Sequence, residues 1–278
     1  GVPIPVFYCK DCEKEYVTPE SLDKVQAIVK EQGTNAWFGL SEKELMPEGA
    51  KCSCGCQEFK KGTDIMDVWF DSGSTHESVL AERGLPEADL YLEGSDQYRG
   101  WFQSSLLTSV AVKGKAPYKE VLTHGYTVDE QGRKMSKSIG NVVAPQEIIK
   151  ESGADVLRLW VLASDYKSDV SVSKNIIKQV TEVYRKIRNT ARYILGNTSD
   201  FDVNNPVAYE DLQEIDKWAL TRLNRLIATC TKAYDTYEFH EAYQAINQFC
   251  VVDMSQFYLD IIKDRLYTSK PDSVERRA

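Results

Sequence analysis

One short segment of this chain combines two ammonium groups with two hydroxyls: Lys134-Met135-Ser136-Lys137-Ser138. The residues before it, 120–128, have a strand-like pattern, and those after it, 145–152, have a helix-like one. Ammonium groups offset phosphate charge, and hydroxyls donate hydrogen bonds that orient phosphate oxygens. The segment therefore predicts a polyphosphate-binding loop. From these residues alone, the alternative is a solvated basic loop.

A second group with chemical potential is formed by cysteines near the N-terminal end of the sequence. Cys9-x-x-Cys12 and Cys52-x-Cys54 are two tight pairs, and Cys56 follows at once as a further candidate. In a chain without a signal-peptide pattern, such pairs favour a metal site or reactive thiols over disulfides. Zinc is the expected ion for four thiolates. The alternative is a set of reduced cysteines without a metal.

The elements that must position these groups fall into three regions. Residues 1–63 have an irregular pattern, apart from one helix that Thr18-Pro19-Glu20-Ser21 opens. No helical or strand pattern is strong enough to fold residues 7–60 alone, so we expect a metal clip to hold them. We interpret residues 1–63 as a zinc-knuckle region joined to the domain that follows.

Residues 64–170 alternate strand-like and helix-like stretches. The expected strands are Asp89–Leu92 and Val121–Val128, and the expected helices are Trp101–Val112 and Ala154–Ala163. Strands that alternate with helices predict a parallel sheet. The fold class is therefore α/β, and this region is interpreted as the second half of a doubly wound, Rossmann-like domain.

Residues 171–278 are wholly helical in pattern and predict an all-α bundle. Apolar residues keep a 3.6-residue period over 176–194, 212–227 and 239–261, and Gly196-Asn197 ends the first helix. Basic residues gather on that first helix, away from its apolar stripe: Lys174, Lys178, Arg185, Arg188 and Arg192. Taken alone, this face is either a solvated surface or a phosphate-binding one.

Length and composition limit the possible functions. With 278 residues the chain is long enough for two domains. Its net charge of −8 excludes a general polycation but leaves room for a local basic face that binds RNA phosphates. It contains no run of about 20 apolar residues and no signal-peptide pattern, so we expect a cytoplasmic protein without a membrane segment.

Several longer stretches carry a family resemblance. Residues 134–138 match the KMSKS signature of class I aminoacyl-tRNA synthetases, with Gly132-Arg133 before it and Gly140-Asn141 after the following residue. We call residues 132–141 the signature loop. Residues 67–73, 92–102 and 123–128 resemble blocks of the isoleucyl, valyl and leucyl branch of that class. The resemblance covers essentially the whole chain, and the longer stretch over residues 1–69 is most similar to bacterial isoleucyl members.

The resemblance implies a site for an aminoacyl-adenylate. Glu93 ends a predicted strand, at the edge where open parallel sheets bind ligands, and the family's matching residue contacts the adenylate. The resemblance gives Asp96 and Gln97 polar contacts with the ribose and the amino group, and Gly94 belongs to the same block.

Three further residues of these blocks are expected at the same site. Trp69 and Trp101 offer a rigid aromatic wall that suits a branched aliphatic side chain. The alternative for both is a core position, which is the more common one for tryptophan. His124 precedes the signature loop, and both a substrate contact and a supporting core role are open for it.

The resemblance also implies roles for the two groups described first. Lys137 is expected to contact ATP phosphate, with Lys134 second and the hydroxyls of Ser136 and Ser138 in the same loop. The family's usual Cys-x-Cys-Gly pattern favours Cys52 and Cys54 over Cys56 as partners of the first cysteine pair. The basic residues of the first bundle helix are expected to contact tRNA phosphates.

The implied reaction is adenylation of isoleucine by ATP, followed by transfer to tRNA(Ile), with Mg²⁺ bound to ATP and a structural zinc ion. We expect a monomer. The class pairs its signature loop with an upstream His-x-Gly-His element, which is absent here, as is an editing insertion. We therefore expect a segment of a larger enzyme that is folded but inactive alone.

Other functions remain open from the sequence. Valyl or leucyl specificity is the alternative within the same branch, because physical reasoning on these residues does not separate the three. A tRNA-binding module without catalysis would use the bundle and the knuckle, with the loop as a phosphate clamp. A structural scaffold of zinc knuckle and bundle would need no nucleotide.

Overall fold

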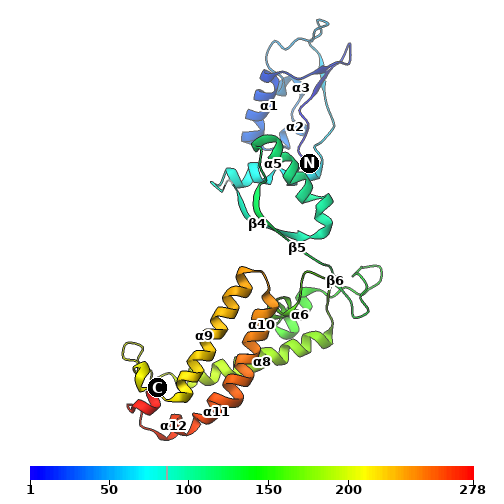
Figure 1. Ribbon diagram of the computed structural model, residues 1–278. Coiled ribbons are helices and arrows are strands. Elements are labelled where there is room, and N and C mark those ends of the chain that lie inside the picture. The colour runs from blue at the N-terminus through cyan, green and yellow to red at the C-terminus, as the bar shows by residue number, and fades with distance from the viewer. Residues whose placement is uncertain (86) are drawn as a thin grey trace. The chain divides into compact units, whose positions relative to one another are not determined.

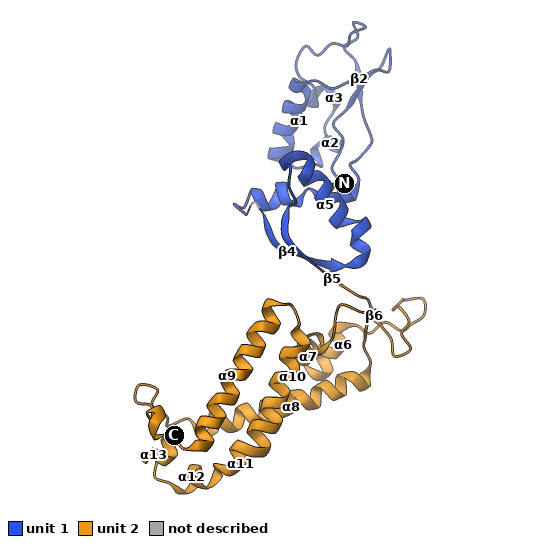
Figure 2. Cartoon of the chain, in the orientation of Figure 1, with its two compact units in different colours: residues 1–123 blue, residues 124–278 orange. Residues whose placement is uncertain are grey.

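The computed structural model describes residues 1–85 and 87–278. It divides into two compact units, Gly1–Thr123 and His124–Ala278, which Figure 2 shows in different colours. Each unit is described by itself below. The domain limits expected at residues 63 and 170 stay predictions.

The first unit begins with a small antiparallel sheet in the order β2-β1-β3, where β1 is Phe7–Cys9, β2 is Glu15–Tyr16 and β3 is Phe59–Lys61. Three helices follow β2 in the chain: α1 (Pro19–Gln32), α2 (Ala36–Gly39) and α3 (Glu42–Leu45). The expected helix start is confirmed, because Thr18 caps α1 and exchanges hydrogen bonds with Ser21.

Residues 7–60 contain a hydrophobic cluster next to the expected cysteine ligands. Trp37 and Leu45 are almost completely buried against the sheet residues Phe7 and Phe59, and the cysteines Cys9 and Cys52 belong to the same cluster. The strands are two or three residues long, which is too short to show a period in the sequence. The cysteine cluster therefore packs directly against a hydrophobic core.

The rest of the first unit is α/β, as expected. Its elements are α4 (Val68–Gly73), a π-helical segment (His76–Ala81), β4 (Ala88–Gly94), a 3₁₀ turn (Ser95–Arg99), α5 (Trp101–Lys113) and β5 (Tyr118–His124). β4 pairs with β5, and the N–H of Ala88 donates to the carbonyl of Pro117, so the two strands start side by side with α5 as their crossover (Figure 1).

The second unit begins with β6 (Thr127–Val128), which pairs in parallel with β7 (Val170–Ser171). The strand expected over Val121–Val128 is therefore two strands. The break falls at Gly125, whose N–H donates to the carbonyl of Tyr166 and whose Cα approaches Ser168 so closely that a Cβ would lie 2.4 Å from its backbone. This close approach removes Gly125 from the strand ladder.

Between β6 and β7 lie the signature loop and two helices, α6 (Pro145–Ser152) and α7 (Ala154–Ala163), both as expected. The helical remainder consists of α8 (Lys174–Asn197), a 3₁₀ turn (Tyr209–Asp211), α9 (Glu214–Asp235), α10 (Phe239–Gln248), a π-helical segment (Phe249–Tyr258), α11 (Leu259–Ile261), α12 (Lys263–Thr268) and α13 (Val274–Arg277). The third expected helix, over 239–261, thus contains a π-helical interruption. Helices α9 and α10 lie side by side in Figure 1, and α8 packs against α10.

An ion pair inside the bundle links two of its helices. The carboxylate of Asp216 in α9 is 2 % exposed and accepts from the guanidinium of Arg265 in α12 and from the hydroxyl of Tyr258. A buried carboxylate needs such donors to offset its desolvation.

Within the described part of the chain, no helix is both long and apolar enough to cross a bilayer.

The contact between α4 and α5 gives a stability prediction. A Cβ on Gly73 would lie 2.8 Å from the backbone of Ser104, whereas a Cβ on Gly39 would meet nothing within 4 Å. We expect Gly73→Ala to lower the free energy of unfolding by about 1–3 kcal/mol through overpacking. The matched control, Gly39→Ala, should stay close to the parent in urea unfolding. Equal stability of the two variants would contradict the close α4–α5 contact.

Candidate functional site

The signature loop is closed by a buried carboxylate that comes directly after β6. Asp129 is 8 % exposed, and its Oδ1 accepts from the backbone N–H of Gln131 at 3.0 Å and of Arg133 at 2.9 Å. Its Oδ2 accepts from the side chains of Arg133 at 2.8 Å and Asn141 at 2.9 Å. The hydrogen bond from Asn141, together with those from Arg133, holds the pKa of Asp129 well below its usual range.

Within this frame the two lysines have different surroundings. The Lys134 ammonium lies 4.1 Å from the ring centroid of Tyr126, which is cation–π distance. Lys137 is exposed, and no carboxylate in the described ranges, 1–85 and 87–278, pairs with it. The hydroxyls of Ser136 and Ser138 lie 2.6 Å apart. The loop thus presents one unpaired ammonium and a pair of hydroxyls to solvent.

Met135 anchors the loop from its other side. Its side chain packs against a buried cluster that includes Ile148 of α6, Val156 of α7 and Ile177 of α8. The alternation of Lys134, Met135 and Ser136 therefore places the apolar side chain inward and the polar groups near the surface. The loop is held at both ends by hydrogen bonds and in its middle by apolar packing.

The residues expected to contact an adenylate lie in the first unit, at the carboxyl end of β4. Glu93 is exposed and Gly94 is buried at the end of the strand. The 3₁₀ turn that follows carries Asp96, which is exposed, and Gln97, whose Nε2 donates to Asp96 at 3.4 Å. The Oε1 of Gln97 accepts from the N–H of Trp101 at 2.9 Å, so this side chain caps the start of α5.

Both expected tryptophans are partly accessible, but their packing differs. Trp101 stacks on Tyr91 with ring centroids 4.3 Å apart, and its indole N–H donates to the carbonyl of Ser72 at 3.0 Å. Trp69 is 46 % exposed, and its ring lies beside Gly100, where a Cβ would be 3.3 Å away. Trp101 is thus fixed in its orientation by stacking and a hydrogen bond, and Trp69 offers open aromatic surface.

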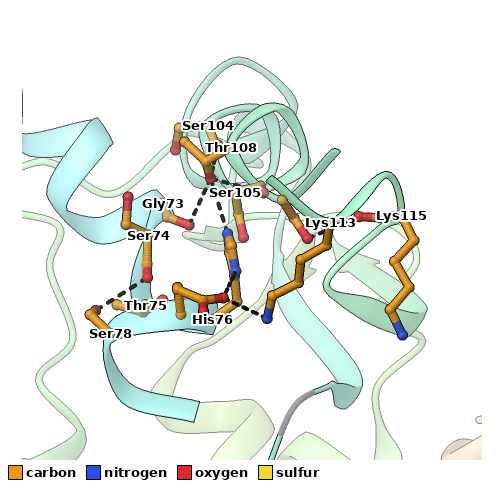
Figure 3. A network of polar contacts seen from close by, with 12 residues as sticks. Gly73, Ser74, Thr75, His76, Ser78, Ser104, Ser105, Thr108, Lys113 and Lys115 are labelled. Carbon is orange, nitrogen blue, oxygen red and sulfur yellow. Dashed lines mark hydrogen bonds and ion pairs between the residues drawn. The ribbon is translucent and has the colours of Figure 1, made fainter. Parts of the chain in front are cut away.

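A buried histidine that the sequence did not single out joins the π-helical segment His76–Ala81 to α5 (Figure 3). His76 is 2 % exposed, and its Nε2 lies 3.1 Å from the hydroxyl of Thr108, which is also 2.9 Å from the carbonyl of Ser104. Because the hydroxyl donates its single proton to that carbonyl, it accepts from Nε2–H. Nδ1 then carries no proton and has no partner among the described residues.

The charges near His76 oppose its protonation. Lys113 pairs with Glu77 at 2.6 Å, and the Glu77 carboxylate lies 4.0 Å from the histidine Nδ1. Burial and the positive charge of Lys113 lower the pKa of His76, and Glu77 opposes them only in part. The neutral imidazole is therefore the form that the contact between the π-helical segment and α5 stabilises.

The four expected cysteine ligands lie together. Their Sγ atoms are all within 4.8 Å of one another, with Cys9 3.6 Å from Cys54 and Cys12 3.6 Å from Cys52. A tetrahedral ion with sulfur ligands at about 2.3 Å requires sulfur atoms about 3.8 Å apart. This cluster can hold a metal ion. Cys56 is outside it and instead accepts from the N–H of Glu58 at 3.3 Å.

Within each cysteine pair the two thiols differ in pKa. The backbone N–H of Cys12 lowers the pKa of Cys9 to about 6, and the N–H of Cys54 likewise lowers that of Cys52. At Cys54 the N–H of Cys56 favours the thiolate, but hydrogen bonding to Cys9 and burial outweigh it and raise the pKa to about 12. In each pair, one cysteine thus has a lowered pKa, which favours the thiolate form that binds cations.

The basic face of α8 is exposed and borders a groove. All five of its basic residues are accessible: Lys174, Lys178, Arg185, Arg188 and Arg192. A groove of about 460 Å³ lies between α6 and α8 and is lined by Lys178 and Arg188 but also by Glu147 and Glu151 of α6. Arg185 pairs with Glu182 at 2.7 Å. The face is therefore basic along α8 and acidic along its border with α6.

The structure brings the expected residues together in three groups. The cysteines form one cluster, residues 93–97 and the two tryptophans lie around the start of α5, and the signature loop lies with α8 in the second unit. His124 is exposed and its Nδ1 lies 2.8 Å from the carbonyl of Gly125, which leaves its role open. Sequence reasoning missed Asp129, Asn141 and His76 as functional residues. An Asp before Gln131-Gly132 is a turn signal that could have indicated the first.

Comparison with known proteins assigns residues 1–173 to the family described as tRNA synthetases class I (I, L, M and V), and residues 216–278 to the anticodon-binding domain of tRNA ligase. The isoleucine–tRNA ligases of Caldicellulosiruptor bescii and Desulfitobacterium hafniense are 60 % and 58 % identical to this chain over its whole length. The chain spans 31 % and 30 % of the length of these two relatives.

Two solved structures share the fold at 18 % identity. A LeuRS–tRNA–LeuAMS ternary complex from Agrobacterium radiobacter has a TM-score of 0.68, with 100 % of this chain and 37 % of that chain covered. Mycobacterium tuberculosis methionyl-tRNA synthetase in complex with methionyl-adenylate has a TM-score of 0.60, with 99 % and 64 % covered. These structures support the predicted α/β fold followed by a helical domain.

His76 gives a prediction of pH-dependent stability. Its folded-state pKa is lowered, so its contribution is fully present above the unfolded value of about 6.5 and is lost as the pH falls below it. We expect the free energy of unfolding to fall less between pH 7.5 and pH 5 in His76→Gln, which keeps a donor for Thr108 but does not titrate. Urea unfolding at both pH values checks this. The exposed His124 serves as the control, and a His124→Gln variant with the same loss of pH dependence would contradict the assignment.

Proposed function

We propose, on the premise that this chain belongs to the class I tRNA synthetases, that the longer protein containing it is an isoleucine–tRNA ligase. Identities of 56–60 % to ligases of that name support this choice over the valyl and leucyl alternatives. The single observation that carries the catalytic role is the signature loop, whose frame leaves the Lys137 ammonium exposed and unpaired within the described residues.

The proposed reaction has two steps. A carboxylate oxygen of isoleucine attacks the α-phosphorus of ATP, a new P–O bond forms, and pyrophosphate leaves with the electron pair of the broken P–O bond. A ribose hydroxyl of tRNA(Ile) then attacks the acyl carbon, loses its proton and displaces AMP. The reactants are anionic, so positioning and charge stabilisation supply most of the catalysis.

The signature loop is proposed to hold the triphosphate. The Lys137 ammonium binds phosphate oxygens directly because no carboxylate among the described residues competes for it. Lys134 joins it by moving from the Tyr126 ring, and the hydroxyls of Ser136 and Ser138 orient further oxygens. Mg²⁺, bound with ATP, would add charge neutralisation on the phosphates.

The residues around the start of α5 are proposed to bind the amino acid and the adenylate. Glu93 and Asp96 are exposed carboxylates, suited to an amino group or ribose hydroxyls, and Gln97 adds a carboxamide beside them. Trp101 is oriented by Tyr91 and Ser72, which makes it a rigid wall for an aliphatic side chain. Trp69 extends this aromatic surface.

The exposed basic residues of α8 are proposed to contact tRNA phosphates, namely Lys178, Arg185, Arg188 and Arg192. The match of residues 216–278 to an anticodon-binding domain supports a tRNA-binding role for the helical part of the chain. The net charge of −8 makes this local face distinct from the rest of the molecule.

A structural zinc ion is proposed for Cys9, Cys12, Cys52 and Cys54. Its effect is to join the two cysteine turns above the core of Phe7, Trp37 and Leu45. The proposed role of the ion is structural, and no reaction step passes through it.

The ligand set can be tested with two neighbouring cysteines. We expect one zinc ion per chain in the parent, well under half of that in Cys54→Ser, and the parent's zinc content in Cys56→Ser. Of these two cysteines, Cys54 belongs to the cluster of four thiols and Cys56 does not. Metal analysis after gel filtration measures all three. A parent with little zinc, or loss of zinc in Cys56→Ser alone, would refute the site.

The nucleotide role is tested by Lys137→Ala in the full-length protein. Loss of a charge-assisted contact of about 1.5–3 kcal/mol should raise the KM for ATP in isoleucine-dependent ATP–pyrophosphate exchange by roughly tenfold or more. Lys150→Ala removes another exposed lysine, from α6, and should behave as the parent. Exchange kinetics unchanged in Lys137→Ala would refute the role of Lys137. A parent without isoleucine-dependent exchange that still binds tRNA would favour the tRNA-binding module without catalysis.

A further inference from the structure

We propose that Asp129 and Asn141 are positioning residues that clamp the two ends of the signature loop and thereby fix the conformation from which its lysines and hydroxyls act. This proposal deepens the proposed function and rests on it only for its kinetic consequence. Neither residue need touch the nucleotide, because both act through the loop backbone. The clamp joins positions twelve residues apart in the chain, through the hydrogen bond from Asn141 Nδ2 to Asp129 Oδ2 at 2.9 Å.

Asn141 serves both functions of a carboxamide at once. Its Nδ2 donates to Asp129 and lies 3.3 Å from the carbonyl of Lys134, and its Oδ1 accepts from the N–H of Ser136 at 2.8 Å. The side chain therefore ties the backbone on both sides of Met135. A bonded Ser136 N–H is withheld from phosphate.

Asp129 holds the opposite end of the loop. Its buried carboxylate accepts from the N–H groups of Gln131 and Arg133, which sets the turn that precedes Lys134. The Arg133 side chain covers the same carboxylate at 2.8 Å. The backbone N–H of Asp129 is also bonded within the turn, because it donates to the carbonyl of Arg133 at 3.0 Å. The turn and the clamp share this one carboxylate.

The chemistry of the pair explains why these two residue types are required. Position 141 needs a donor toward a carboxylate and an acceptor for an N–H, and a neutral carboxamide provides both. An Asp at this position would set two carboxylates against each other, and an Ala would leave the Asp129 oxygen short of one donor. Exchanging the two residue types restores one donor–acceptor pair between them.

The experiment measures hydrogen exchange of the Ser136 amide in the 278-residue chain. We expect Asn141→Ala and Asn141→Asp to exchange about tenfold faster or more than the parent, with an unchanged melting temperature. The double variant Asp129→Asn with Asn141→Asp should recover part of the protection, which a merely local effect at position 141 would not do. Asn224→Ala, an exposed position on α9, is the matched control.

A second measurement separates the clamp from the reaction. In the full-length protein, Asn141→Ala should raise the KM for ATP about tenfold and leave the KM for isoleucine within twofold. Unchanged Ser136 exchange in Asn141→Ala overturns the clamp, and faster exchange with an unchanged KM for ATP overturns its positioning role. A parent enzyme without ATP–pyrophosphate exchange refutes the proposed function instead, and the exchange of the Ser136 amide still decides whether the clamp exists.

Discussion

The carboxylate of Asp129 organises the segment on which the proposed chemistry depends. It lies below the surface, directly after a two-residue strand, and takes donors from Gln131, Arg133 and Asn141. A buried charge is tolerated only with such donors, so the loop must close around it. The positive groups that remain on the loop are then directed outward. The proposed polyphosphate site is thus built over a buried negative charge whose hydrogen bonds are already satisfied.

Apolar packing gives the same loop a second connection. Met135 packs on a cluster that α6, α7 and α8 share, and the opposite face of α8 is lined with exposed basic residues. The proposed ATP-binding loop and the proposed tRNA-binding helix therefore rest on one core within the second unit. In the first unit, the orientation of Trp101, part of the proposed amino-acid site, depends on Ser72 of α4 and Tyr91 of β4.

Some of this could be predicted from local sequence. The start of α1 follows from Thr18-Pro19, because a cap and an N-terminal proline act within one turn. The cysteine cluster follows from the spacing of the two pairs together with the family's Cys-x-Cys-Gly pattern, and α7 follows from an apolar period. Other features depend on partners far along the chain. The break at Gly125 is caused by the backbone of Ser168, and the burial of His76 is caused by α5, neither of which a local pattern contains.

Chemical footprinting of lysines in the full-length protein tests the central claim that the clamped loop binds the phosphates of a nucleotide. An amine-reactive reagent would be applied with saturating ATP, with adenosine and without ligand, and the modification rate of each lysine followed by mass spectrometry. We predict that ATP slows the modification of Lys137 several-fold and that adenosine does not. Equal modification of Lys137 in all three conditions, with ATP bound, would contradict the account.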